Sequence, residues 1–130
     1  MKKLILVLTL IVMSMSLSAQ ESEVIKGDFI HSVYFWLKNP DSKADRDAFE
    51  KSLKKFINSS KVILSKHIGM PASTNREVID NTYTYSLIVS FKNKEMHDKY
   101  QEEDVHKTFI GESQNLWKKV LIYDSVNTLD

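Results

Sequence analysis

The sequence predicts an α+β fold in which a four-stranded antiparallel sheet carries helices on one face. Residues 29–38 are rich in β-branched and aromatic side chains and are bounded by Gly27 and Pro40, which is typical of a strand. In residues 82–92, large aromatic or aliphatic side chains alternate regularly with smaller, mostly polar ones, as in a half-buried strand. In residues 43–60, apolar residues recur at helical spacing, so a helix joins the first strand to the next.

The first predicted strand carries large side chains on both of its faces. Alternation places His31 within a row that is otherwise apolar, and a histidine there indicates a pocket. Such a strand must be covered on both sides, so we expect helices over one face and a second sheet over the other. The row that includes His31 also holds Phe29, Val33, Phe35 and Leu37, and the opposite row holds Ile30, Ser32, Tyr34 and Trp36.

The next elements follow from local signals. Ser42, with Asp45 three residues later, resembles a helix cap, and that helix should end at residues 58–60. Residues 61–68 predict a second strand and residues 70–81 a polar loop. The third strand, residues 82–92, should place one row of large side chains on one face: Tyr83, Tyr85, Leu87, Val89 and Phe91.

The last third of the chain predicts two helices and a strand. Asn93 can cap a short helix containing Met96, His97 and Tyr100. Asp104 can cap a further helix from Val105 to about Lys119, which would include Leu116, Trp117 and an unfavourable Gly111. Residues 120–126 then form the fourth strand, and both His97, beside Asp98, and His67 are expected at the surface.

This order matches the ferredoxin-like βαββαβ arrangement. Ile30, Tyr34 and Trp36 are too large and apolar to leave in water on the free face of the sheet. A second copy of the same sheet is the simplest way to cover this face. We therefore expect a homodimer that packs face to face through these residues, as in a dimeric α+β barrel.

The first 19 residues have the pattern of a secretory signal peptide. Lys2 and Lys3 precede an apolar run that is shorter than the roughly 20 residues of a membrane span, and small residues lead to a cleavage site after Ala19. We expect export to the periplasm or beyond, and no membrane association after cleavage. The predicted organisation is a leader (1–19), an N-terminal extension (20–28), one domain (29–126) and a C-terminal tail (127–130).

Composition excludes several classes of function. The chain of 130 residues is 42% hydrophobic and 27% charged, as one globular domain would be. Without Lys2 and Lys3, 16 basic residues face 17 acidic ones, so nothing in the charge favours nucleic acid. The absence of cysteine excludes disulfides, thiolate catalysis and zinc–thiolate sites.

The motifs resemble the stress-responsive α/β-barrel (Dabb) family over nearly all of the domain. The resemblance is carried by residues 31–38, residues 83–91, Tyr100 with His106 six residues later, and residues 121–124. It implies a dimeric α+β barrel. A plant polyketide cyclase of this family has a Tyr and a His spaced as Tyr100 and His106 are, in a pocket between sheet and helices, and a first-strand His that His31 matches.

One departure from the family concerns the start of the last helix. The family commonly has His-Pro-x-His there, whereas this chain has Glu103, Asp104, Val105 and His106. The fold does not depend on the lost His and Pro, but an identical reaction does not follow.

The three candidate catalytic residues are His106, Tyr100 and His31. A neutral His106 could take a proton from a carbon next to a carbonyl, Tyr100 could hydrogen-bond the enolate oxygen, and His31 could orient the substrate or His106. The alternative is structural: the two histidines bond each other or the backbone, and Tyr100 is part of the core.

Three functions stay open at the level of sequence. We favour an exported protein whose pocket binds a small apolar or aromatic molecule without changing it. The second is a cofactor-free cyclase or lyase that uses His106 and Tyr100, and the third, by analogy of fold alone, is a haem-handling monooxygenase. We expect no cofactor, and no metal site, because these histidines have no carboxylate at ligand spacing.

Overall fold

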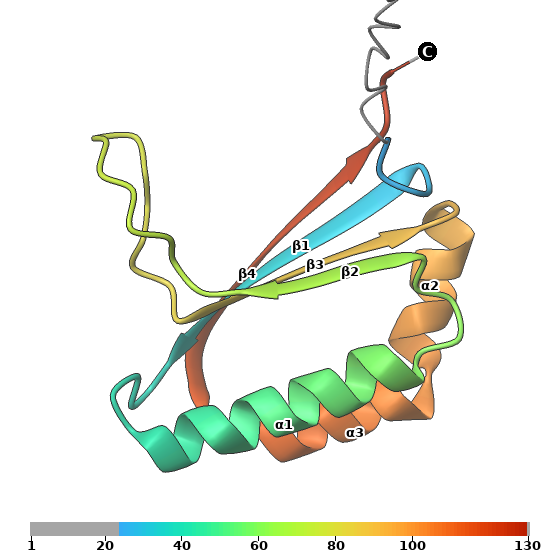
Figure 1. The fold of residues 1–130 in the computed structure, drawn as a ribbon. Coiled ribbons are helices and arrows are strands. Elements are labelled where there is room, and N and C mark those ends of the chain that lie inside the picture. The colour runs from blue at the N-terminus through green and yellow to red at the C-terminus, as the bar shows by residue number, and fades with distance from the viewer. Residues whose placement is uncertain (1–23, 130) are drawn as a thin grey trace, which may run out of the picture.

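The computed structural model describes residues 24–129, which form a four-stranded antiparallel sheet with helices on one face (Figure 1). The order of strands across the sheet is β2-β3-β1-β4, so β1 lies inside the sheet between β3 and β4. This confirms the predicted ferredoxin-like α+β fold. In chain order the elements are β1 (Phe29–Leu37), α1 (Lys43–Ser59), β2 (Ser65–Gly69), β3 (Tyr85–Phe91), α2 (Lys94–Glu102), α3 (Asp104–Ser113) and β4 (Trp117–Val126).

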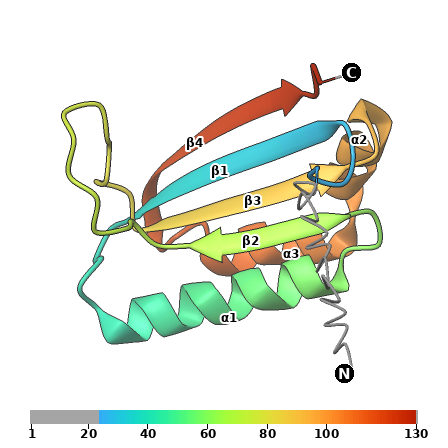
Figure 2. The ribbon, with the colours of Figure 1, turned by 45° about the horizontal axis from the view of Figure 1, so that its top comes forward.

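Two of the helices pack as a pair, and the third lies at one end of the sheet. α1 and α3 run side by side along one face of the sheet, and α2 packs near one end of it (Figures 1 and 2). The helix-facing row of β1 is buried as predicted, with His31 only 3% exposed. Apolar burial beneath α1 and α3 stabilises this layer. The buried core combines Phe29, Val33, Phe35, Leu37, Phe49, Leu53, Phe56, Ile57, Tyr85, Leu87, Val89, Phe91, Tyr100 and Phe109.

Two helix caps are confirmed. The backbone N–H of Asp45 donates to Ser42 Oγ at 3.2 Å, which starts α1 where the sequence predicts. The backbone N–H of Met96 donates to Asn93 Oδ1 at 3.0 Å and starts α2. Each cap satisfies a backbone donor that the first turn of a helix leaves without a partner.

Two strands begin later than predicted. β2 begins at Ser65 instead of residue 61, because Ser60 and Lys61 turn to bind the side chain of Glu103. β3 begins at Tyr85.

Tyr83 does not lie in the buried row of β3 as predicted. Its ring packs against Tyr34 and Trp36, which point to the open face of the sheet, with ring centroids 5.1 Å and 6.4 Å away. Tyr83 therefore covers the face opposite to the helices.

The predicted last helix is too long. α3 ends at Ser113, and Trp117 already belongs to β4, where it pairs with Leu37. The backbone N–H of Lys38 also donates to the carbonyl of Leu116 at 2.8 Å. Residues 117–119 thus pair with the end of β1, and this pairing outweighs their local helical pattern.

Trp36 is covered by its own chain. Its indole N–H donates to Thr82 Oγ1 at 3.0 Å, and Lys119 Nζ lies 4.2 Å from the ring centroid. The residue is 9% exposed. Among the predicted dimer contacts, Ile30 and Tyr34 remain half-buried on the open face.

Within residues 24–129, none of the helices combines the length and apolar character that crossing a membrane requires. The predicted leader, residues 1–19, lies outside the described residues.

Candidate functional site

The three residues singled out from sequence meet around the ring of Tyr100. Tyr100, on α2, is 1% exposed, and its ring centroid lies 5.6 Å from that of His31 on β1. The ring of His106, on α3, lies 5.0 Å from that of Tyr100, and His106 is half-buried. Three elements far apart in sequence therefore bring these side chains together under one end of the sheet. Their catalytic role stays a prediction.

Asp124 is a fourth member of the cluster that the sequence did not identify as a site residue. β1 and β4 are antiparallel, and their register places Asp124 directly opposite His31. Both side chains point to the helix side, and His31 Nδ1 donates a hydrogen bond to Asp124 Oδ1 at 2.6 Å. The side chain of Asp124 is 40% exposed, because β4 is an edge strand. The carboxylate fixes the tautomer of His31, so its Nε2 carries the free lone pair.

His97 is the fifth member, and its prediction as a surface residue is wrong. It is 8% exposed, its ring stacks on Phe29 at 4.7 Å, and it lies 4.9 Å from the ring of His31. α2 packs its inner face against the end of the sheet. Residues three apart on a helix share a face, so His97 turns inward together with Tyr100.

Both nitrogens of His97 have partners on its own helix. The side-chain amide nitrogen of Gln101 lies 3.0 Å from His97 Nε2, and Asp98 Oδ1 lies 3.4 Å from His97 Nδ1. These contacts hold the imidazole ring in a defined orientation against the sheet.

Burial sets the charge of the cluster. It lowers the pKa of His31 below its ordinary value, although Asp124 opposes the shift through its hydrogen bond and its charge. Burial also lowers the pKa of His106, and the neighbouring His31 adds to that effect. The pKa of Tyr100 is raised, mainly by burial and then by the charges of Glu103 and Asp124. At neutral pH the site therefore offers two neutral imidazoles and a protonated phenol.

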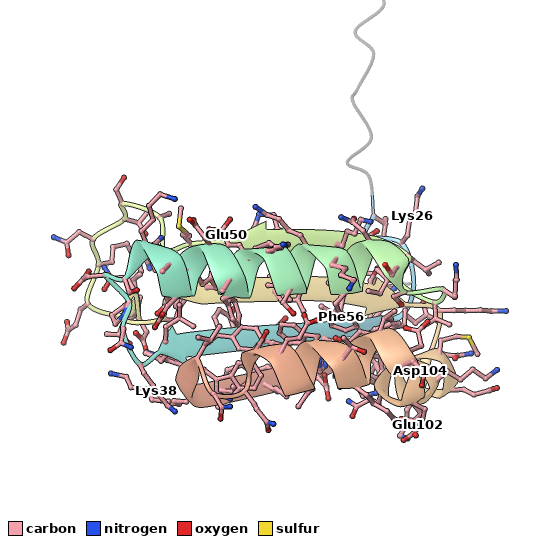
Figure 3. All side chains as sticks on the ribbon, turned by 90° about the horizontal axis from the view of Figure 1, so that it is seen from below. Lys26, Lys38, Glu50, Phe56, Glu102 and Asp104 are labelled. Carbon is pink, nitrogen blue, oxygen red and sulfur yellow. The ribbon has the colours of Figure 1, made fainter. Side chains whose placement is uncertain are left out.

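A small cavity adjoins the cluster through the ring of Phe56. This ring stacks on Phe109 at 5.2 Å and contacts His106 at 5.2 Å and Tyr100 at 5.3 Å. Figure 3 shows Phe56 between α1 and α3. A cavity of about 160 Å³ opens between these helices, and Phe56 is one of its lining residues. Its lining residues are Ser52, Lys55, Phe56, Asp104, Val105, Thr108, Phe109 and Glu112.

Glu103, at the position where the family commonly has a histidine, has a structural contact. Its carboxylate accepts hydrogen bonds from Ser60 Oγ at 2.6 Å and from the backbone N–H of Lys61 at 2.7 Å. These bonds tie the end of α1 to the start of α3. They fix the helix that carries His106, whose backbone N–H donates to the carbonyl of Glu103 at 3.0 Å.

The arrangement supports two kinds of chemistry. A neutral imidazole beside a buried phenol can move a proton to and from a small substrate. In addition, ligand atoms of His31, His97 and Asp124 all lie within 4.8 Å of one another. The prediction of no metal site depended on the lack of a carboxylate near the histidines, and Asp124 supplies one.

Solved structures of several proteins share this fold. A Dabb-family protein from Mesorhizobium loti is 19% identical, with a TM-score of 0.66 over 80% of this chain and 100% of that one. A protein of unknown function from Thermobifida fusca, described as dimeric and ferredoxin-like, is 10% identical, with a TM-score of 0.63 over 82% and 97%. The hydroxynitrile lyase from Passiflora edulis is 13% identical, with a TM-score of 0.67 over 80% and 97%.

At these identities the similarity shows the fold alone. No curated protein is similar enough to this sequence to count as a match. Residues 29–127, however, match the family model of the stress responsive A/B barrel domain, which agrees with the motifs around His31, Tyr100 and His106. The chain therefore belongs to the stress-responsive A/B barrel (Dabb) domain family.

Proposed function

We propose that the protein is a cofactor-free acid–base catalyst of the lyase or cyclase type. Its substrate would be a small carbonyl-bearing molecule with an apolar or aromatic body. The observation that carries the proposal is the His31–Asp124 pair, joined at 2.6 Å and placed against Tyr100, which in turn contacts His106. A protein that only binds an apolar molecule has no need of a carboxylate-oriented imidazole, so the His31–Asp124 pair supports catalysis over simple binding.

Each side chain has a distinct role in this proposal. His106 takes a proton from the carbon next to a carbonyl group and becomes an imidazolium. The phenol of Tyr100 donates a hydrogen bond to the enolate oxygen that forms. The enolate carbon then attacks a second carbonyl of the same molecule, and the imidazolium returns its proton to the new alkoxide. His31, held by Asp124, presents Nε2 as an acceptor and orients a substrate hydroxyl group.

Deuterium exchange tests the proton-transfer step on simple carbonyl compounds, whatever the physiological substrate is. The purified protein is incubated in D₂O with a panel of small aryl ketones and β-diketones, and the loss of the C–H signal next to the carbonyl is followed by NMR. His106→Ala should slow the catalysed exchange by about 10² to 10⁴-fold, the usual contribution of a general base. His67→Ala is the matched control, because His67 is exposed on β2 and should leave the rate unchanged.

An aromatic hydroxynitrile belongs in the same panel, since a structural neighbour is a hydroxynitrile lyase. There the base would take the hydroxyl proton while the carbon–carbon bond to cyanide breaks and the carbonyl forms. Equal rates in the wild type and the His106→Ala variant across the panel would contradict the proposal.

A second candidate is binding without turnover. It is favoured by the cavity between α1 and α3, where Phe56, Val105 and Phe109 provide an apolar lining. In this case aromatic compounds would raise the melting temperature, the wild type would catalyse no exchange, and Phe109→Trp, which fills the space, would abolish the thermal shift.

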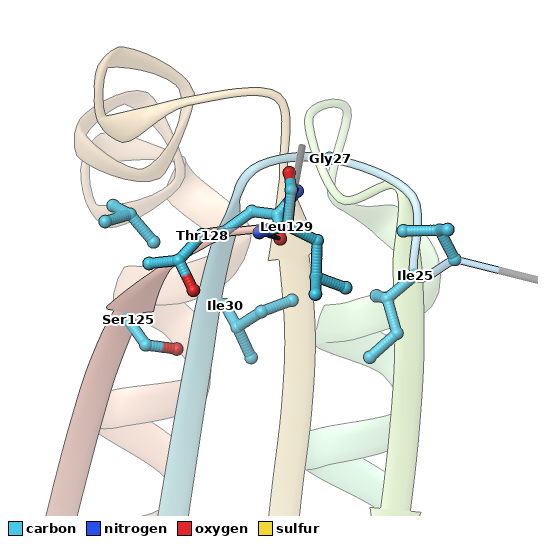
Figure 4. Close-up of a pocket in the computed structure, with 9 residues that line it drawn as sticks. Ile25, Gly27, Ile30, Ser125, Thr128 and Leu129 are labelled. Carbon is cyan, nitrogen blue, oxygen red and sulfur yellow. Dashed lines mark hydrogen bonds between the residues drawn. The ribbon is translucent and has the colours of Figure 1, made fainter.

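We also propose that the protein is a homodimer through the open face of the sheet. Ile30 and Tyr34 are half-buried there, and Tyr123 on β4 is 60% exposed. A cavity of about 400 Å³ at the end of this face is lined by Ile25, Ile30 and Leu129 among others, and a second sheet would cover it (Figure 4). Similar structures are described as dimeric.

Export remains part of the proposal. The pattern of residues 1–19 supports it, because a basic start is followed by an apolar run and then by small residues before Ala19.

A further inference from the structure

We propose that His31, His97 and Asp124 form a binding site for a divalent transition-metal ion, with zinc as the reference ion. The three residues come from β1, α2 and β4, and their ligand atoms all lie within 4.8 Å of one another. The inference goes beyond the proposed function. It uses His31 and Asp124, which that function also uses, but neither His106 nor Tyr100 is a ligand.

The distances suit a metal centre. Zinc bonds of about 2.0–2.2 Å place neighbouring ligand atoms about 3.3 Å apart. His31 Nδ1 and Asp124 Oδ1 lie 2.6 Å apart, and all of the ligand atoms lie within 4.8 Å of one another, so small adjustments reach that spacing. The ion would take the place of the proton between His31 and Asp124, and that proton would move to His31 Nε2 as the imidazole changes tautomer. Small side-chain rotations complete the site.

The surroundings already hold the ligands in place. His31 and His97 are buried, and His97 stacks on Phe29 at 4.7 Å. Metal-bound histidines usually engage their second nitrogen with a neighbouring polar group. Whichever nitrogen of His97 binds the metal, the other keeps a partner, Gln101 at Nε2 or Asp98 at Nδ1.

The ligand set selects the class of ion. Two imidazoles and one carboxylate suit zinc, cobalt, nickel or ferrous iron, whereas calcium and magnesium prefer oxygen ligands only. Three protein ligands leave a coordination position free. Asp124 lies on an edge strand with its side chain 40% exposed, so the ion can enter from solvent and keep a water molecule.

Metal titration of the protein without a polyhistidine tag tests the site. After treatment with EDTA and its removal, zinc chloride is titrated by calorimetry, and cobalt(II) is added in parallel to record visible absorption. We expect one equivalent of zinc per subunit, a higher melting temperature with zinc, and a cobalt spectrum typical of a low-coordinate site.

Variants locate the ion. Asp124→Asn and His97→Phe, which preserves the ring stack on Phe29, should each weaken zinc binding by more than about a hundredfold, the upper limit for losing an outer partner. Gln101→Ala should weaken it by about tenfold to a hundredfold if this amide supports His97 Nε2. His67→Ala, a change to an exposed histidine on β2, should leave binding unchanged.

Three results would overturn the inference. The first is that the wild type binds no zinc. The second is that the Asp124→Asn variant and the His97→Phe variant each still bind zinc as the wild type does. The third is that the His67→Ala variant no longer binds it. His106→Ala separates this inference from the proposed function, because the variant should lose about 10² to 10⁴-fold in the exchange rate yet still bind zinc.

Discussion

Replacing Glu103 by alanine should destabilise the protein and loosen the helix that carries His106. The carboxylate of Glu103 accepts two short hydrogen bonds, from Ser60 Oγ and from the backbone N–H of Lys61. They join the end of α1 to the start of α3. Although Glu103 is the N-cap residue of α3, its side chain makes no cap hydrogen bond, so the substitution removes no capping bond of this helix.

The magnitude follows from the two bonds. A hydrogen bond to a charged group contributes about 1.5–3 kcal/mol when buried. Glu103 is only half-buried and Lys61 is exposed, so water can replace part of each bond after the substitution. We therefore expect a loss of about 2 kcal/mol in the free energy of unfolding for both bonds together. For a domain of this size that corresponds to a fall of about 8–16 °C in melting temperature.

Glu102→Ala is the matched control. Glu102 is the adjacent residue, and its only ion pair in the described chain joins it to Lys107 at 3.1 Å, with both side chains largely exposed. Its removal should cost no more than about 0.5 kcal/mol. Urea unfolding followed by tryptophan fluorescence, at one protein concentration, measures both variants. If Glu103→Ala and Glu102→Ala unfold at the same urea concentration, the connection contributes nothing and the reasoning is refuted.

Three further predictions concern protonation, assembly and processing. The pKa of His106 is lowered from its ordinary value of 6.5 by burial, so the native state binds fewer protons there than the unfolded state. The contribution of neutral His106 to stability is therefore complete above pH 6.5 and is lost as the pH falls through the pKa of the folded state. NMR titration in the presence of EDTA measures this pKa. A value at or above 6.5 would contradict the prediction. Ile30→Glu should convert a dimer into monomers in sedimentation experiments, whereas Val78→Glu, on the exposed loop before β3, should not. Mass spectrometry of the exported protein should find an N-terminus at Gln20, and a retained Met1 would exclude cleavage of the predicted leader.

Local sequence signals determined much of the fold. The alternation in residues 29–38 correctly identified β1 and its buried row, and Ser42 and Asn93 correctly marked the starts of α1 and α2. These features depend on neighbours within a few residues, where side-chain period and capping chemistry act directly. The family motifs then named His31, Tyr100 and His106, which the structure places together.

Tertiary structure decided the features that depend on distant partners. Residues 117–119 fit a helix by their spacing, yet pairing with the end of β1 makes them part of a strand. Tyr83 continues the alternation of β3 in sequence but packs on the opposite face, because β3 begins only at Tyr85. A local pattern does not reflect the free energy gained by pairing with a strand from the other end of the domain sequence, as β4 pairs with β1.

The composition of the site shows the same division. The sequence by itself placed His31 in a buried row and supplied Tyr100 and His106, but it left Asp124 without a role and His97 at the surface. Asp124 joins the site only because the antiparallel register of β1 and β4 sets it opposite His31. His97 joins only because α2 packs against Phe29 at the end of the sheet. Register and helix docking are fixed by the whole core folding at once, and for that reason only the three-dimensional structure reveals the carboxylate and the additional imidazole.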